Sequence, residues 1–194
     1  MIKNIILDIG GVMFDDSNAN IEKLLGRECS KLCKIAHSNG FKKSLLGEMT
    51  IDEHIEELKN EEDYEDLKYI LSKENLSESY PIMQENFDYI MSLRKRGFKL
   101  YILSNITEDS YHYINDLIDF EKSFDGGIYS YQEHMVKPNH DIYNLVIDRY
   151  GLKKEETVFF DDREKNVIAA NEVGIKSYVF KNINDIEEVI NEEV

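Results

Sequence analysis

The sequence lacks the features that mark disulfide-stabilised, secreted and membrane-spanning proteins. It has only two cysteines, Cys29 and Cys33. Their i, i+4 spacing is typical of small apolar residues on one face of a helix, so we expect neither a disulfide framework nor a zinc site. No signal peptide is recognisable, and no apolar run approaches the ~20 residues needed to cross a bilayer. We therefore expect a cytoplasmic protein without a membrane partner.

Positive charge is also scarce. Lys and Arg number 23 against 39 Asp and Glu, which gives a formal net charge of −16. Such a field repels polyphosphate backbones within a Debye length of about 8 Å, so nucleic acid is not an expected partner. Acidic runs such as residues 61–66 are typical of a solvated helix face. The composition predicts nothing about the oligomeric state.

The sequence does contain enough hydrophobic residues for one core with an insert. Hydrophobic residues make up 42% of the 194 positions. Short apolar runs predict strands within 3–8, 98–105, 124–130, 157–162 and 175–180. Helical spacing fills the segments between them, at 82–96, 107–119, 139–150, 164–173 and 183–192. This alternation predicts an α/β fold with a Rossmann-like, doubly wound parallel sheet.

Residues 15–82 interrupt that alternation. Apolar residues recur there at helical spacing, and residues 50–53, "TIDE", form a capping box before another apolar pair. We predict an α/β core made of residues 1–14 and 83–194, and an inserted α-helical domain made of residues 15–82.

Polar side chains follow several predicted strands at their carboxyl ends, where ligands bind in open parallel sheets. Asp8 ends the first strand, Ser104 ends the second, and Asp161 and Asp162 end the fourth. Lys137 lies in the loop after the third strand. Carboxylates favour Mg²⁺, and a lysine beside a hydroxyl suits a phosphate group. The set therefore predicts phosphoryl transfer.

The order of these motifs resembles the haloacid dehalogenase-like (HAD-like) hydrolase superfamily. The matching stretches are "DIGGV" with Asp8, "LSN" with Ser104, "KP" with Lys137, and "DD" at 161–162 followed by Asn166. The resemblance covers nearly the whole chain. It implies that the helical insert is a cap domain, which covers the active site and helps to select substrates.

The resemblance also implies a role for each matching residue. Asp8 would be the nucleophile that forms an aspartyl-phosphate. Ser104 and Lys137 would be catalytic and would bind the phosphoryl group, with help from the Asn105 amide.

The implied metal is Mg²⁺, held by the Asp8 carboxylate, the Gly10 carbonyl and the Asp162 carboxylate. Asn166 would reach a metal-bound water. Asp161 is less certain, because glycine often stands at its position in the superfamily. The expected partner is therefore a small phosphorylated substrate.

One position departs from the superfamily's phosphatase pattern. A second aspartate usually stands two residues after the nucleophile as general acid and base, and here that residue is Gly10. General acid–base assistance typically contributes about 10²–10⁴-fold in rate, so its loss should restrict the leaving group. Asp15 and Asp16 are typical of a turn or the start of a helix; alternatively, Asp15 contacts the substrate's hydroxyls or substitutes for the missing acid.

Three functions remain open from the sequence. The first is a Mg²⁺-dependent phosphatase of a small metabolite such as a hexose 1-phosphate. The second is a non-catalytic protein that binds a phosphorylated ligand or a partner. The third is a metal-independent 2-haloacid dehalogenase, which needs no proton donor for halide. The third is disfavoured by "DD" at 161–162, because crowded carboxylates in a metal-free site would repel each other.

Overall fold

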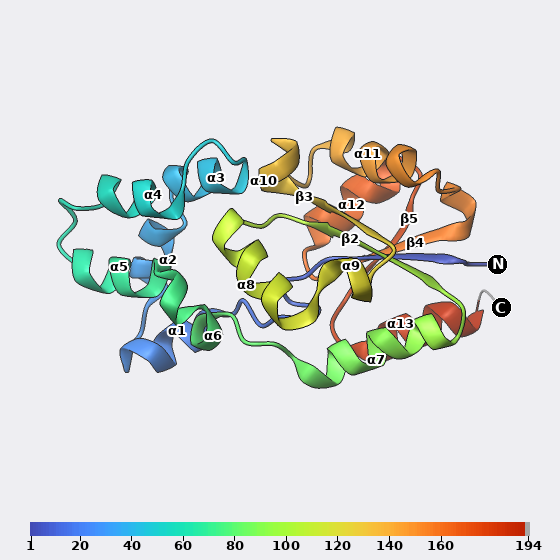
Figure 1. Ribbon diagram of the computed structural model, residues 1–194, viewed down its shortest axis with the longest axis horizontal. Helices are drawn as coiled ribbons and strands as arrows, with labels where there is room; N and C mark the ends of the chain where they lie inside the picture. Colours follow the sequence, from blue (N-terminus) through green and yellow to red (C-terminus); the bar gives the residue numbers. More distant parts are fainter. Residues whose placement is uncertain (193–194) are drawn as a thin grey trace.

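The computed structural model describes residues 1–192 and consists of a parallel sheet beside a block of helices (Figure 1). The five strands lie in the order β3-β2-β1-β4-β5, and every neighbouring pair is parallel. This is the predicted doubly wound α/β fold. Their bounds are β1 (Asn4–Leu7), β2 (Lys99–Ser104), β3 (Gly126–Tyr129), β4 (Thr157–Asp161) and β5 (Lys176–Val179).

Helices cover both faces of the sheet, which explains why its central strands β1, β2 and β4 are mostly apolar and almost entirely buried. One face packs against α7 (Gln84–Lys95), α8 (Glu108–Ile118), α9 (Phe120–Ser123) and α13 (Ile183–Glu192). The other face packs against α11 (His140–Tyr150) and α12 (Glu164–Glu172), which lie above the sheet in Figure 1. The short α10 (Ser130–Glu133) follows β3. All four residues of β1 and all five of β4 are buried.

The helical block forms a separate layer at the carboxyl end of the sheet (Figure 1). Its helices are α1 (Asn18–Leu25), α2 (Ser30–Ala36), α3 (Asn39–Leu45), α4 (Ile51–Glu57), α5 (Tyr64–Leu71) and α6 (Leu76–Ser79), with a 3₁₀ turn at Lys73–Asn75. The helical block has its own apolar cluster, separate from the two clusters against the sheet, which includes Cys29, Leu32 and Leu67. Cys29 and Cys33 are buried, as expected of small apolar side chains at this spacing; Cys29 directly precedes α2 and Cys33 lies within it.

Two connections join the helical block to the sheet, and they run side by side. The backbone N–H of Asp15 donates to the Pro81 carbonyl at 2.9 Å, and that of Met83 donates to the Met13 carbonyl at 2.8 Å. These contacts fall where the sequence placed the domain boundaries, at 14/15 and 82/83. The division into two domains stays a proposal.

The predicted helices and strands agree closely with the observed ones. The capping box at Thr50 and Glu53 is formed with both of its hydrogen bonds. Gly151 ends α11 in the left-handed region with φ 60°, and Gly97 and Gly174 follow α7 and α12 with positive φ. Among residues 1–192 no helix is long and apolar enough to cross a membrane.

Candidate active site

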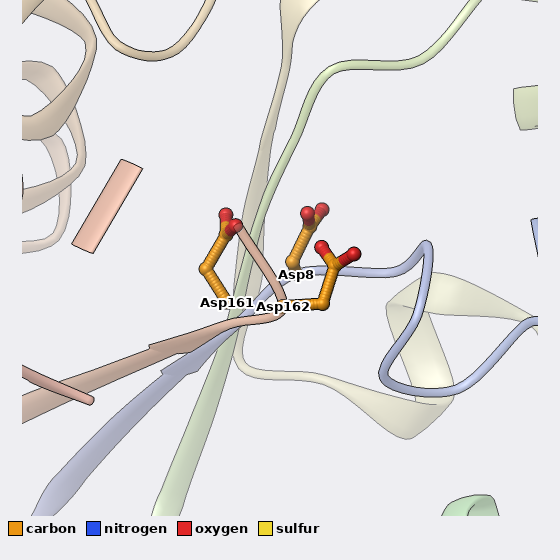
Figure 2. Close-up of side chains that lie close together, drawn as sticks. All are labelled: Asp8, Asp161 and Asp162. Carbon is orange, nitrogen blue, oxygen red and sulfur yellow. The ribbon is translucent and has the colours of Figure 1, made fainter. Parts of the chain in front are cut away.

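The predicted site residues meet at the carboxyl edge of the central strands. Asp8 follows β1, and Asp161 and Asp162 stand at the end of the neighbouring β4, which is where the strand order reverses direction. Ligand oxygens of these three carboxylates lie within 4.8 Å of one another. Figure 2 shows the three side chains pointing to the same side of the sheet edge.

Lys137 is buried between two of these carboxylates. Its Nζ lies 2.8 Å from Asp8 Oδ2 and 2.6 Å from Asp161 Oδ2, and it donates to the Leu103 carbonyl at 2.8 Å. The side chain is only 1% exposed. Three acceptors use all three N–H donors of the ammonium group. Burial alone would lower the pKa of Lys137, but Asp8 and Asp161 outweigh it and raise that pKa.

The Asp8 carboxylate is held in one orientation. Its Oδ1 accepts hydrogen bonds from the Ser104 hydroxyl and the Ile9 N–H, both at 2.7 Å. Burial raises the pKa of Asp8 above its ordinary value, although Lys137 acts in the opposite direction. Ser104 is therefore close enough to contact any group that bonds to Asp8.

Asp161 and Asp162 have different surroundings. Asp161 is fully buried and saturated: it accepts from Lys137, from the Arg163 N–H and from the Asn166 amide. These donors hold the pKa of Asp161 below its ordinary value, against the effect of burial. Asp161 therefore holds Lys137 and Asn166 in place, a role that the sequence left undefined.

Asp162, by contrast, has a buried Oδ1 without a hydrogen-bond partner among the described residues. Burial and the nearby charges of Asp16 and Asp161 raise the pKa of Asp162. An unpartnered carboxylate oxygen near Asp8 is a fitting ligand for a divalent cation. The Asn166 Oδ1 is likewise buried without a partner, as expected of a group that reaches a metal-bound water. The donor set therefore fits Mg²⁺.

Asn105 acts on the loop that carries Lys137. Its Oδ1 accepts from the Lys137 N–H at 2.8 Å, and its Nδ2 donates to the Lys137 carbonyl at 3.0 Å. The Asn105 amide therefore fixes the backbone of Lys137. Contact between the Asn105 amide and the substrate stays a prediction.

Residues 9–14 form a tight turn after the nucleophile. The Phe14 N–H donates to the Ile9 carbonyl at 3.1 Å, and the Gly11 N–H donates to the Phe14 carbonyl at 2.8 Å. Gly11 has φ 67°, and a Cβ there would lie 2.6 Å from the Asp162 carboxyl carbon. The turn thus requires glycine at position 11 for its backbone and for its space.

The turn brings Asp16, and not Asp15, beside Gly10. Asp15 Oδ1 accepts from the Ser17 N–H at 3.0 Å, so this side chain belongs to the start of α1. The neighbourhood of Gly10 also includes Tyr80, and Arg163 pairs with Asp16. The sequence alone did not single out Tyr80 or Arg163, because nothing in their local pattern places them near Asp8.

Comparison with protein families identifies the chain. The family model of the haloacid dehalogenase-like hydrolases matches residues 2–174. The chain belongs to this hydrolase family. The predicted resemblance is therefore confirmed at the level of family and fold, and the roles of individual site residues remain proposals.

Among curated relatives, several HAD-like matches are phosphatases by name. The sesquiterpene phosphatase astK of Aspergillus oryzae is 33% identical over 86 residues, 44% of each chain. The D-ribitol-5-phosphate phosphatase of Bacteroides thetaiotaomicron is 26% identical over 194 residues, 92% of this chain and 91% of the relative. Other relatives are much longer: the match spans 17% of the mouse bifunctional epoxide hydrolase 2.

Solved structures share the fold. A HAD family enzyme from Bacteroides thetaiotaomicron, in a magnesium complex, superposes with a TM-score of 0.78 over 97% of this chain and 98% of its own, at 22% identity. L-2-haloacid dehalogenase from Xanthobacter autotrophicus superposes with a TM-score of 0.63 at 18% identity, over 91% of this chain and 76% of its own. The same fold thus serves more than one reaction, so the site has to decide the function.

Proposed function

We propose that this HAD-like hydrolase is a Mg²⁺-dependent phosphatase of a small phosphorylated metabolite and works through an aspartyl-phosphate at Asp8. The observation that carries the proposal is the cluster of Asp8, Asp161 and Asp162, in which the buried Asp162 Oδ1 accepts no hydrogen bond from any residue among 1–192. In a metal-free dehalogenase this carboxylate would add to the repulsion of the nucleophile, which the charges of Arg163 and Lys137 offset only in part. The magnesium and phosphate complexes of the Bacteroides thetaiotaomicron enzyme support the same metal.

In the first step, an Asp8 oxygen attacks the phosphorus, and the bond from phosphorus to the leaving oxygen breaks with its electron pair on that oxygen, which then takes a proton from solvent. Lys137 touches Asp8 already, so its ammonium group is placed to neutralise negative charge on the transferring phosphoryl group. The Ser104 hydroxyl can turn from Asp8 to a phosphoryl oxygen. Asp161 keeps Lys137 oriented through the reaction.

Asp8, the Gly10 carbonyl and Asp162 would hold the metal. Bound there, Mg²⁺ supplies positive charge that shields the phosphate from the anionic nucleophile. Water then attacks the aspartyl-phosphate, inorganic phosphate leaves, and Asp8 is regenerated.

The substrate class we propose is a sugar phosphate such as a hexose 1-phosphate. Two relatives carry carbohydrate substrates in their names: the D-ribitol-5-phosphate phosphatase and the phosphorylated carbohydrates phosphatase of Thermotoga maritima, 36% identical over 70 residues, 32% of the relative's length. Gly10 provides no proton for the leaving oxygen. The enzyme should therefore prefer anomeric or acyl phosphates, whose leaving groups need little protonation, to simple alkyl phosphates.

The test measures phosphate release from alkyl, anomeric and acyl phosphates in Mg²⁺ or in EDTA. Asp8→Asn keeps the shape of the side chain and removes the nucleophile; Asp116→Asn, an exposed position on α8, is the matched control. We expect release that requires Mg²⁺, is lost in Asp8→Asn and is retained in Asp116→Asn. Equal turnover of alkyl and anomeric phosphates would contradict only the leaving-group argument and would leave the proposed phosphatase activity in place.

Two other outcomes would replace the proposal. Phosphate or a sugar phosphate that binds without turnover would indicate a non-catalytic protein that binds a phosphorylated ligand. Halide release from 2-chloropropionate in EDTA would indicate a dehalogenase. Isothermal titration with inorganic phosphate and a halide electrode distinguish these outcomes.

A further inference from the structure

The residue at position 10 is glycine because another carboxylate fills the space beside it. A Cβ built on Gly10 would lie 2.9 Å from Asp16 Oδ2, 3.2 Å from Asp16 Cγ and 3.2 Å from the Tyr80 hydroxyl. Gly10 is not among the glycines with positive φ, so its backbone does not by itself demand glycine. A side chain at position 10 is therefore opposed by the Asp16 carboxyl group, which would have to move, and not by the backbone conformation.

The turn of residues 9–14 creates this arrangement. It reverses the chain after the nucleophile, and the bond from Asp15 to Pro81 then fixes the first residues of the connection to the helical block. Asp16 returns in this way to the place where an aspartate at position 10 would begin its side chain. A carboxyl group is therefore present at the site, although it comes from the other end of the turn.

Asp16 is held by a cation and is open to water. The Arg163 Nη2 lies 3.2 Å from Asp16 Oδ2, and the Arg163 Nε lies 4.0 Å from Asp162 Oδ1. The Asp16 side chain is 35% exposed. In the ionised form in which it pairs with Arg163, a carboxylate accepts protons and has none to donate.

We propose that Asp16 takes the place of the missing carboxylate at position 10 in the second step, where it accepts a proton from the water that hydrolyses the aspartyl-phosphate. This rests on the proposed function. The water oxygen bonds to phosphorus, and the bond from phosphorus to the Asp8 oxygen breaks with its electron pair returning to Asp8. One water proton passes to Asp16 and is then released to solvent.

This assignment separates the two steps. Asp16 assists the step that needs a proton acceptor, while the leaving oxygen of the first step receives no proton from it. The rate of the first step therefore depends on the leaving group, and the rate of the second step does not. The Tyr80 hydroxyl borders the same space, 3.2 Å from a Cβ built on Gly10, so it is placed to donate a hydrogen bond to this water.

The experiment is rapid-mixing kinetics with p-nitrophenyl phosphate, whose leaving group needs no proton. In Asp16→Asn we expect the rate of the p-nitrophenol burst to stay within twofold of the wild type. The steady rate should fall about 10²-fold and phosphoenzyme should accumulate. Asp15→Asn is the matched control and should keep both rates, because its side chain serves the start of α1.

A second pair of variants tests position 10 directly. Gly10→Asp alone should lower activity, because its Cβ meets Asp16. Gly10→Asp with Asp16→Gly removes the contact with Asp16, leaves only the 3.2 Å contact with the Tyr80 hydroxyl, and should recover most of the second-step rate.

Equal loss of the burst rate and the steady rate in Asp16→Asn, without phosphoenzyme, would overturn the assignment. A double variant no faster than Asp16→Asn would do the same. A wild-type enzyme that forms no phosphoenzyme from any phosphate would instead contradict the proposed function.

Discussion

Lys137 is the group on which the stability of the site should depend most. Its ammonium group is buried between Asp8 and Asp161 and has no access to water that could replace them. Lys137→Met keeps most of the side-chain volume and removes the charge. Two carboxylates would then face each other without their shared cation.

The expected cost follows from that arrangement. Removal of one partner of a buried ion pair typically costs about 3–5 kcal/mol, because the remaining charge is left uncompensated. For a chain of this length each kcal/mol corresponds to roughly 2–4 °C, so the melting temperature in EDTA should fall by roughly 6–20 °C. Adding Mg²⁺ should reduce the difference, since a cation bound to the folded site stabilises it by mass action.

The assay is thermal and urea unfolding at pH 7, with EDTA and with Mg²⁺. Lys137→Met combined with Asp161→Asn removes one of the two facing charges and should recover part of the lost stability. If Lys137→Met in EDTA were within 1 kcal/mol of the wild type, by the scale for buried pairs, the account of Lys137 as the charge that holds the site together would be wrong.

Three further predictions concern other parts of the molecule. Gly47 and Gly26 both have positive φ, but a Cβ on Gly47 would lie 2.2 Å from the Tyr131 carbonyl oxygen, whereas one on Gly26 would meet no described atom within 4 Å. In urea unfolding, Gly47→Ala should therefore cost about 1–3 kcal/mol more than Gly26→Ala. Equal costs would contradict the contact between the α3–α4 loop and α10. Gly11→Ala should abolish activity and lower stability, because it clashes with Asp162 in a left-handed turn, and a circular-dichroism melt beside the phosphatase assay checks both. Partial burial would raise the pKa of Asp125, but hydrogen bonds from Lys99 and the Leu100 N–H hold it below the unfolded value of 3.8. A lowered folded-state pKa stabilises the protein above the unfolded value, and this stabilisation is lost as pH falls through the folded value. In urea unfolding, Asp125→Asn should therefore cost about 1 kcal/mol at pH 7, and the cost should shrink as pH falls below 3.8.

The fold was predictable because its signals are local and repeat along the chain. Each apolar run stops at a polar residue, and helical spacing follows until a glycine such as Gly151. In a parallel sheet the carboxyl ends of neighbouring strands share one edge, so Asp8, Ser104 and Asp162 could be predicted from the sequence alone to lie together. The capping box at Thr50 was predictable because it is also a local signal, contained within four residues.

The polar contacts of the site were not predictable in the same way. Whether Asp161 or Asp162 has a free oxygen depends on Lys137 and Asn166, which lie at other positions of the fold. Asn105 could be placed near the phosphoryl group, but its two hydrogen bonds to the Lys137 backbone depend on the course of the loop. Such pairings carry no signature in the sequence.

Gly10, two residues after the nucleophile, has no side chain, and its meaning depends on the turn that contains it. From the sequence alone, Gly10 is a lost acid and Asp15 is the candidate to replace it. The turn points to its neighbour instead: the bond from Ser17 holds Asp15 at the start of α1, while Asp16 faces Gly10. The same contact explains why restoring an aspartate at position 10 should impair the enzyme unless Asp16 is removed with it. Glycine at position 10 and the carboxylate of Asp16 are therefore one arrangement, and neither should be exchanged alone without loss of activity.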